Sequence, residues 1–310
     1  MRAAGIRATG GPVEQLELPE PPAPAPDEVV IEVRAAGVGH WDRFVQRGEW
    51  DVGISPPMAL GVEAAGVVVA AGGRARVSVG AEVMTHAAPL RHQGTWAERA
   101  LVAADAVALK PRAASWDEAA AFPVPALTAA QALDSIGVLP GRRLLVTGAG
   151  GVTGSLVVHL ALAQGAEVIA TAGPESSRRL KALGVMLVDH RRDDWPETVR
   201  ELTGGFGADG TVNARVGGAV AAMTATADGG RLATITGDPP PSERGIMVAD
   251  VYVQADGTQL ADLASLLGAG ALTITASYPL GDAAEALARV VAGRAGGAVV
   301  LHPRDHVVAS

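Results

Sequence analysis

Short apolar runs separated by turn residues make up the first third of the chain. Four of them have the length and the β-branched content of strands: residues 29–35, 66–70, 82–85 and 98–102. Gly and Pro interrupt the pattern at turn-like intervals, and the Pro-rich stretch 19–26 is typical of a stiff, extended connector. The pattern predicts a β-rich region, similar to a partly open barrel, up to about residue 115.

A different pattern begins near residue 117. Residues 117–137 predict a helix, a turn interrupted by proline and a second helix. Strand-like runs then alternate with helical segments, and the runs are 144–147, 167–171, 186–189, 210–213, 231–236 and 248–253. This alternation predicts an α/β fold with a doubly wound parallel sheet. From residue 278 onward the pattern predicts one helix and one strand that return to the first region.

The first strand of the alternating region leads into a glycine-rich turn. Residues 144–154 read LLVTGAGGVTG, with Gly148, Gly151 and Gly154 three residues apart, and an apolar helical segment follows. Glycine lets the backbone approach a pyrophosphate closely, and the N-terminus of the next helix favours its charge. Because strand, turn, helix and second strand occur in the required order, we predict a dinucleotide site that includes Val152 and Thr153.

Composition limits the kind of partner and of site. Hydrophobic residues make up 48% and charged residues 19% of the 310 residues, as in soluble globular proteins. The net charge of −8 argues against a nucleic-acid partner. The sequence has no run that predicts a membrane span and no signal-peptide core, so a cytoplasmic protein is expected. The chain has no cysteine, which excludes disulfides and cysteine-ligated zinc.

The segment after the second strand of the alternating region bears on the choice of cofactor. An acid at the end of that strand would bind the ribose hydroxyls of NAD, but residues 171–179 (TAGPESSRR) have only Glu175, which lies beyond the strand. Ser176, Ser177 and Arg178 can donate to the 2′-phosphate of NADPH, as can the neighbouring second arginine. We therefore predict NADPH, and expect one of the two arginines to lie on the solvated face of a helix.

Seven segments together resemble the zinc-independent medium-chain dehydrogenase/reductase superfamily, close to its quinone-oxidoreductase branch. They run in family order and cover nearly the whole chain: 35–50, 56–72, 94–102, 122–134, 144–154, 229–237 and 281–301. The resemblance implies a GroES-like substrate domain over 1–117 and 274–310 and a Rossmann cofactor domain over 118–273. It also implies a substrate cleft between the domains, an oxidoreductase that uses NADPH, a small-molecule substrate and a homodimer.

Three departures from the family pattern concern metals. Zinc-dependent relatives place their catalytic metal ligands at positions that here hold Gly39, Val62 and Val124, and none of these side chains binds a metal. No metal site is therefore expected.

Quinone-oxidoreductase relatives usually carry Asn where this chain has Gly39, and often a tyrosine near Trp50. This chain lacks both of these polar groups.

The resemblance also places candidate residues for catalysis. His40, Trp41 and Asp42 correspond to a cleft-lining loop, where His40 is a candidate proton donor or else a surface histidine. Trp41 and Trp50, with Trp96, suggest a stacking surface for a flat substrate, although a barrel core explains Trp96 equally well.

Two further positions take a predicted role from the resemblance. Thr128 corresponds to a position close to the nicotinamide, and it can also cap a helix that starts there. Glu63 is expected to hold a nearby arginine or backbone groups. The other six histidines show no metal-ligand spacing and are given no role.

These features favour a zinc-free NADPH-dependent reductase that transfers hydride to a quinone or to the C=C bond of an activated enone. Two alternatives stay open. One is an enoyl or ketone reductase of specialised, polyketide-type metabolism with a bulky substrate. The other is a non-catalytic NADPH-binding scaffold or sensor.

Overall fold

The computed structural model describes residues 1–137, 140–268, 270–293 and 295–304. Contacts between Cα atoms divide the chain into two units, Met1–Leu127 with Gln254–Ser310, and Thr128–Val253. The second unit lies inside the range 118–273 that the sequence predicts for a cofactor domain.

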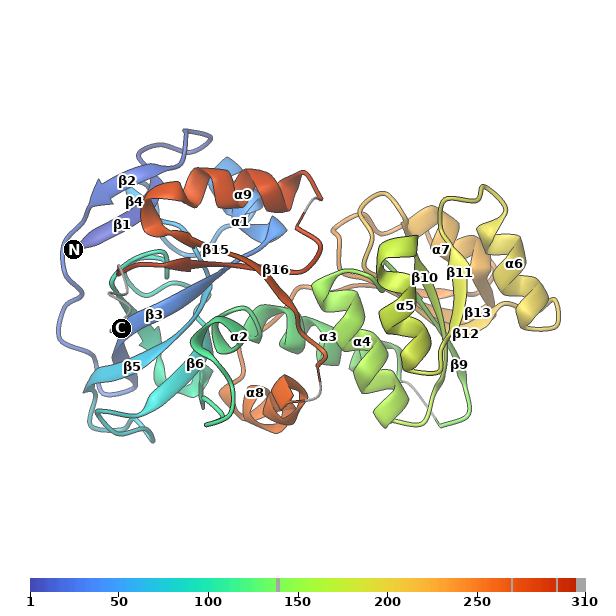
Figure 1. Ribbon diagram of the computed structural model, residues 1–310, viewed down its shortest axis with the longest axis horizontal. Helices are drawn as coiled ribbons and strands as arrows, with labels where there is room; N and C mark the ends of the chain where they lie inside the picture. The colour runs from blue at the N-terminus through green and yellow to red at the C-terminus, as the bar shows by residue number, and fades with distance from the viewer. Residues whose placement is uncertain (138–139, 269, 294, 305–310) are drawn as a thin grey trace. The chain divides into compact units, whose positions relative to one another are not determined.

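The first unit is built from two sheets. The smaller has the order β2-β1-β4, and the larger runs β15-β16-β3-β5-β6-β8 with β7 also paired to β3 (Figure 1). The strands are β1 (Arg2–Ile6), β2 (Glu14–Glu17), β3 (Glu28–Val38), β4 (Met58–Ala59), β5 (Glu63–Ala71), β6 (Glu82–His86), β7 (Arg99–Ala103), β8 (Val107–Leu109), β15 (Ile274–Pro279) and β16 (Ala298–His302). β16 pairs antiparallel with β3, which confirms the predicted return of the chain.

The helices that lie wholly in the first unit are short, with five to nine residues each. They are α1 (His40–Arg47), α2 (Trp116–Ala120), α8 (Gly257–Leu263) and α9 (Ala283–Val291), with 3-10 turns η1 (Ala104–Ala106), η2 (Ala264–Gly268) and η3 (Leu280–Asp282). α1 packs against α9, and α2 packs against β3 and β5. α3 (Pro123–Ile136) begins in the first unit and ends in the second.

The second unit contains one six-stranded parallel sheet in the order β11-β10-β9-β12-β13-β14. Its strands are β9 (Arg143–Thr147), β10 (Glu167–Ala172), β11 (Met186–Asp189), β12 (Ala208–Asn213), β13 (Thr226–Thr234) and β14 (Met247–Asp250). The helices between them are α4 (Val152–Ala163), α5 (Pro174–Ala182), α6 (Trp195–Leu202) and α7 (Ala219–Ala225). The predicted doubly wound α/β sheet is confirmed, with β14 at an edge where a strand over 248–253 was expected.

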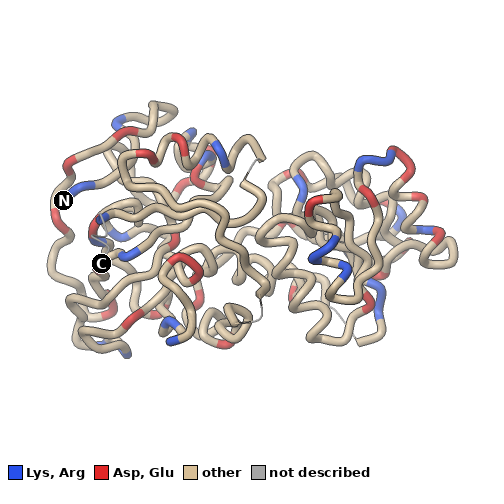
Figure 2. Tube along the Cα trace, in the orientation of Figure 1, with Lys and Arg blue, Asp and Glu red and all other residues tan. Residues whose placement is uncertain are grey.

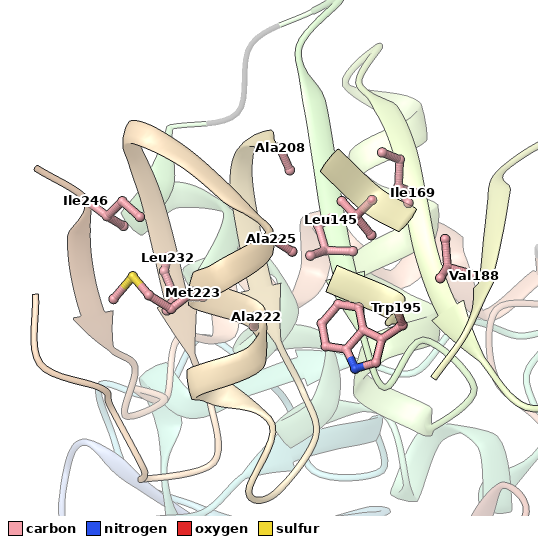
Figure 3. Packing of buried hydrophobic residues seen from close by; sticks show 11 residues of the cluster. Leu145, Ile169, Val188, Trp195, Ala208, Ala222, Met223, Ala225, Leu232 and Ile246 are labelled. Carbon is pink, nitrogen blue, oxygen red and sulfur yellow. The ribbon is translucent and has the colours of Figure 1, made fainter. Parts of the chain in front are cut away.

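An apolar core holds α6 and α7 against one face of this sheet (Figure 3). Trp195 of α6 and Met223 of α7 are buried together with strand residues such as Leu145 and Ile169. From β9 the chain first moves through β10 to β11, with α4 and α5 as the connections, and it then moves in the opposite direction to β12 and β13. Because the crossovers are right-handed, α4 and α5 lie on the face opposite to α6 and α7. The helices therefore change sides between β9 and β12, and this change defines the switch point of the sheet.

Charge and hydropathy agree with the composition. Acidic and basic residues are interspersed along both units (Figure 2). Among the residues that the structure describes, no helix has both the length and the apolar character needed to cross a bilayer.

Candidate functional site

The glycine turn between β9 and α4 is packed too closely for side chains. Gly148 has a φ of +67°, and a Cβ there would lie 2.7 Å from the carbonyl oxygen of Ala214. A Cβ at Gly154 would lie 2.3 Å from the carbonyl oxygen of Gly148. Both distances are well below van der Waals contact. The turn therefore requires glycine at both positions, as a backbone cradle for a pyrophosphate does.

The N-terminus of α4 keeps its amide groups free of a side-chain cap. The N-cap, Gly151, is exposed and has no side chain with which to accept from the first turn, which begins with Val152 and Thr153. Unpaired N–H groups and the positive end of the helix dipole attract an anion. Together with the glycine packing, this arrangement fits the pyrophosphate of a dinucleotide.

The residues predicted to select NADPH lie at the start of α5. Gly173 is its N-cap, and the hydroxyls of Ser176 and Ser177 donate to the Gly173 carbonyl at 3.3 and 2.8 Å. Both serines are half-buried, and Arg178 is exposed. The serines and Arg178 therefore lie on the first turns of the helix that follows β10, where the adenosine ribose of a dinucleotide is expected.

Arg179, not Arg178, contacts the glycine turn. Its guanidinium donates to the Ser155 Oγ at 2.9 Å and to the carbonyl oxygen of Gly150 at 3.0 Å. The expectation that one of the two arginines is solvated is thus met by Arg178. The sequence offered no means of choosing between them, because the choice depends on the residue at which α5 begins.

In the first unit, Gly39 precedes α1 and leaves room for an indole. A Cβ at Gly39 would lie 2.1 Å from Cε2 of Trp41. The indole Nε1 of Trp41 is buried, and no residue of the described chain is its hydrogen-bond partner. The resemblance implied a loop at residues 40–42, and this is wrong, because α1 begins at His40. Gly39, in an extended conformation, is the N-cap of α1, and the Asp42 carboxyl group accepts a hydrogen bond from the Gly39 amide.

Two buried carboxyl groups lie near this helix start. Oδ2 of Asp42 accepts from the Gly39 amide at 2.8 Å, and Oε2 of Glu63 accepts from the Val124 amide at 2.8 Å. Burial raises the pKa of Asp42 to about 8, against the effect of its backbone hydrogen bonds. Burial, and then the neighbouring Asp42, raise the pKa of Glu63 well above its ordinary value. As expected, Glu63 holds a backbone group.

His86 and Trp50 extend this cluster. His86 is paired with Glu63 across β5 and β6, so the two side chains share one face of the sheet. The His86 Nδ1 lies 3.1 Å from the Val62 carbonyl oxygen, and burial lowers the pKa of the ring. The Trp50 ring centroid is 6.4 Å from that of His86. Sequence reasoning gave His86 no role, and only its strand register reveals the pairing.

The other predicted residues of the first unit are placed as follows. His40 is exposed, and partial desolvation lowers its pKa below the ordinary value. Trp96 is fully buried and donates its indole N–H to the Gly37 carbonyl at 2.9 Å, so the barrel core explains it rather than a stacking surface. Val62 and Val124 are buried apolar side chains. Within the described ranges, no group of three acidic, histidine or cysteine side chains is arranged to hold a metal ion.

Thr128, predicted to lie close to the nicotinamide, is a buried residue of the second unit. The alternative that it caps a helix is wrong, because α3 begins at Pro123 and Thr128 lies in its interior.

Comparisons with known proteins agree with this geometry. Two family models match, the alcohol dehydrogenase GroES-like domain over residues 25–112 and the zinc-binding dehydrogenase over residues 183–301. The chain is 30% identical to the 2-methylene-furan-3-one reductase of Solanum lycopersicum, over 89% of this chain and 72% of that protein. It also matches polyketide synthases at 34 to 36% identity, but spans only 6 to 10% of their length.

Solved structures match over nearly the whole chain. A quinone oxidoreductase from Pseudomonas syringae pv. tomato DC3000 is 26% identical with a TM-score of 0.85, covering 97% of this chain and 99% of that one. A mycobacterial protein solved in complex with NADPH is 27% identical with a TM-score of 0.85, covering 98% of this chain and 100% of that one.

Proposed function

We propose that this chain, which belongs to the medium-chain dehydrogenase/reductase superfamily, is an NADPH-dependent reductase that acts on a quinone or on the C=C bond of an activated enone. The observation that carries the proposal is the glycine turn of the second unit. Its backbone excludes side chains at Gly148 and Gly154, and the uncapped start of α4 follows directly. The quinone oxidoreductase and the furanone reductase among its relatives support the choice of acceptor.

NADPH is proposed over NADH from the residues that follow β10. Ser176 and Ser177 place two hydroxyls on the first turn of α5, and Arg178 supplies an exposed guanidinium nearby. The guanidinium is a suitable donor to a ribose phosphate, and each serine hydroxyl can donate to it after turning away from the Gly173 carbonyl. The relative solved with NADPH supports the same choice.

Reduced nicotinamide supplies a hydride, and the protein must orient the acceptor, exclude water and provide a proton. We propose that Trp41 and Trp50 contact a flat acceptor and that His40 donates the proton. Asp42 occupies the buried side of the same helix start, and its raised pKa keeps the carboxyl largely protonated at neutral pH. A neutral acid there avoids an uncompensated charge beside an apolar substrate.

A second candidate function is supported by the matches to polyketide synthases. In this version the chain is an enoyl reductase for a bulky polyketide-type substrate. The same hydride chemistry applies, but the acceptor is larger and more specific. Activity with a polycyclic enone and none with simple quinones would favour this candidate.

A homodimer formed through β14 is also part of the proposal. β14 is an edge strand with β13 on one side, and its first residue, Met247, and Tyr252 just beyond its end are largely exposed. Edge strands of this kind can extend a sheet across two subunits. Light scattering after size-exclusion chromatography should give the mass of a dimer at micromolar concentration, and a monomer would contradict this part.

The reductase is tested by NADPH oxidation with a benzoquinone, a naphthoquinone, a linear enone and a polycyclic enone. Each acceptor is repeated with NADH and with EDTA. EDTA-resistant turnover that prefers NADPH is expected. NADPH binding without turnover on any acceptor would instead support a non-catalytic scaffold or sensor.

The cofactor preference is tested with the double variant Ser177→Ala, Arg178→Ala. We expect the KM for NADPH to rise by about tenfold and the KM for NADH to change little, because only NADPH carries the ribose phosphate. Equal changes for the two cofactors would contradict the assignment.

A further inference from the structure

A chain of hydrogen-bonded side chains crosses three neighbouring strand ends of the parallel sheet. Thr147 ends β9 and donates its hydroxyl to Oδ1 of Asn213, which ends β12, at 2.6 Å. Nδ2 of Asn213 donates to Oγ1 of Thr234 at 3.2 Å and to Oγ1 of Thr236 at 3.1 Å. Thr147, Asn213 and Thr234 are all buried. The chain therefore links β9, β12 and β13 beneath the surface.

The same network holds the loop that follows β12. Nδ2 of Asn213 also lies 3.1 Å from the carbonyl oxygen of Arg215, so its two hydrogens are shared among three acceptors. Asp238 accepts hydrogen bonds from Thr234 and Thr236 through Oδ1, and from the Gly217 amide through Oδ2 at 2.8 Å. The network thus contacts the loop at 214–218 at two points: the Asn213 side-chain amide contacts the Arg215 carbonyl, and the Asp238 carboxylate contacts the Gly217 amide.

This network lies at the switch point of the sheet. β9 and β12 are neighbours there, and the cradle glycine Gly148 is packed against the carbonyl group of Ala214. In doubly wound sheets a dinucleotide crosses the carboxyl edge at this point, with its adenosine half on the β10 side. The loop at 214–218 is consequently on the side of the nicotinamide half.

Stability alone does not explain so many polar side chains in this position. Buried apolar residues of similar volume are often equally stabilising, whereas a satisfied polar network fixes one geometry. The loop it fixes is short and rich in glycine, so it has little packing of its own.

We propose that Asn213, with Thr147, Thr236 and Asp238, is a positioning network that sets the 214–218 loop for the nicotinamide half of the cofactor. The inference rests on the proposed binding of NADPH. Asn213 is a positioning residue, because it acts through the loop and through the glycine turn.

Calorimetry with two ligands separates this role from a general loss of structure. NADPH contacts the whole dinucleotide site, whereas adenosine 2′,5′-bisphosphate contacts the adenosine side only. For Asn213→Leu we expect the Kd for NADPH to rise about tenfold and the Kd for the bisphosphate to change less than about twofold. Thr236→Val removes a single half-buried hydroxyl, and it should weaken NADPH binding by a smaller factor while leaving the Kd for the bisphosphate unchanged. This variant replaces Asn213→Leu in the test if Asn213→Leu does not fold.

Thr211→Val is the matched control. Thr211 lies two residues before Asn213 on β12, is equally buried, and pairs with the Thr226 hydroxyl at 2.7 Å. It should lower the thermal midpoint without changing the affinity for either ligand.

Two results would overturn the inference while leaving NADPH binding intact. One is parallel weakening of both ligands by Asn213→Leu and Thr236→Val, and the other is an NADPH-specific loss in Thr211→Val as large as theirs. Failure of the wild-type protein to bind either ligand would overturn the proposed function, and this inference with it.

Discussion

The two candidate sites are built in different ways. In the second unit, the proposed cofactor site consists mainly of backbone, and close approaches at Gly148 and Gly154 determine its shape. In the first unit, the candidate substrate site consists of side chains whose polar groups are buried, such as the Trp41 indole N–H and the Asp42 carboxyl. A backbone site tolerates few substitutions. A side-chain site can change its chemistry while the fold persists.

The largest expected effect breaks the backbone site. Gly148→Ala adds a Cβ 2.7 Å from the Ala214 carbonyl oxygen at a positive φ, so the turn must move. We expect NADPH affinity, measured by calorimetry, to fall by about a hundredfold. Gly184→Ala is the control, because Gly184 also has a positive φ but open space around it. An equal loss in the control would mean that backbone strain, and not the cradle, is responsible.

The next effect concerns the buried acid of the first unit. The folded-state pKa of Asp42, about 8, lies far above that of an unfolded aspartate. Between these values the folded protein holds a proton that the unfolded chain has released, so the free energy of unfolding falls as pH rises, by at most about 1.4 kcal/mol per pH unit. In urea unfolding at several pH values, Asp42→Asn should make the decrease in the free energy of unfolding with pH less steep. The decrease that remains is the part due to Glu63.

Asp27→Asn provides the comparison for this measurement, since Asp27 is exposed. If Asp27→Asn flattened the pH dependence of unfolding as much as Asp42→Asn does, the loss of a carboxyl group in general, and not its burial, would be responsible. A wild-type protein whose stability is constant from about pH 5 to pH 8 would contradict the raised pKa of Asp42.

A smaller effect is expected from filling the space between Gly39 and the Trp41 indole. Gly39→Ala places a Cβ within 2.1 Å of the Trp41 ring, so the ring must leave its position. We expect the KM for the acceptor to rise about tenfold with an unchanged Kd for NADPH, because the change lies in the first unit. Trp41→Phe tests the indole N–H separately. If Gly39→Ala leaves acceptor kinetics unchanged, the position of Trp41 does not matter to the reaction.

The proton donor can be examined by pH. Desolvation lowers the pKa of His40, and a donor must be protonated, so kcat should fall as pH rises through that lowered pKa. His40→Gln should lower kcat severalfold and remove this limb of the profile. A profile that is flat in the wild type from about pH 5 to pH 7 would contradict the assignment.

The smallest effect belongs to Arg179. Its contacts are with Ser155 and Gly150, not with the start of α5 where the ribose phosphate is proposed to bind. Arg179→Ala should therefore weaken NADPH and NADH equally, by about threefold. Selective loss of NADPH would instead assign Arg179 to the ribose phosphate.

The sequence predicted the second unit well because its signals are local. Glycine spacing, strand length and the order of elements carry the dinucleotide fold, and each strand of 144–213 was placed within two residues. Strands β1, β2, β4, β8 and β15 were missed. β2, β4 and β8 have only two to four residues, and β15 alternates half-buried with exposed residues, so their apolar runs are weak.

The first-unit site was less accessible because its relations are nonlocal. The pairing of Glu63 with His86 depends on strand register, and the buried state of Asp42 depends on the packing of α1. The Asn213 network was missed for the same reason, since its members come from three strands and two loops. A polar residue at the end of a predicted buried strand was its only local signal.

The pairing of β16 with β3 has a consequence for the order of events during synthesis. The inner strand β3 leaves the ribosome early, but its partner on one side is made more than two hundred residues later, after the whole second unit. β7 pairs with residues 28–32 on that side, so only the end of β3 over 36–38 waits for β16. The second unit is continuous in sequence, so all of its strands are synthesised before β16. The larger sheet of the first unit is therefore completed only after the second unit has been synthesised.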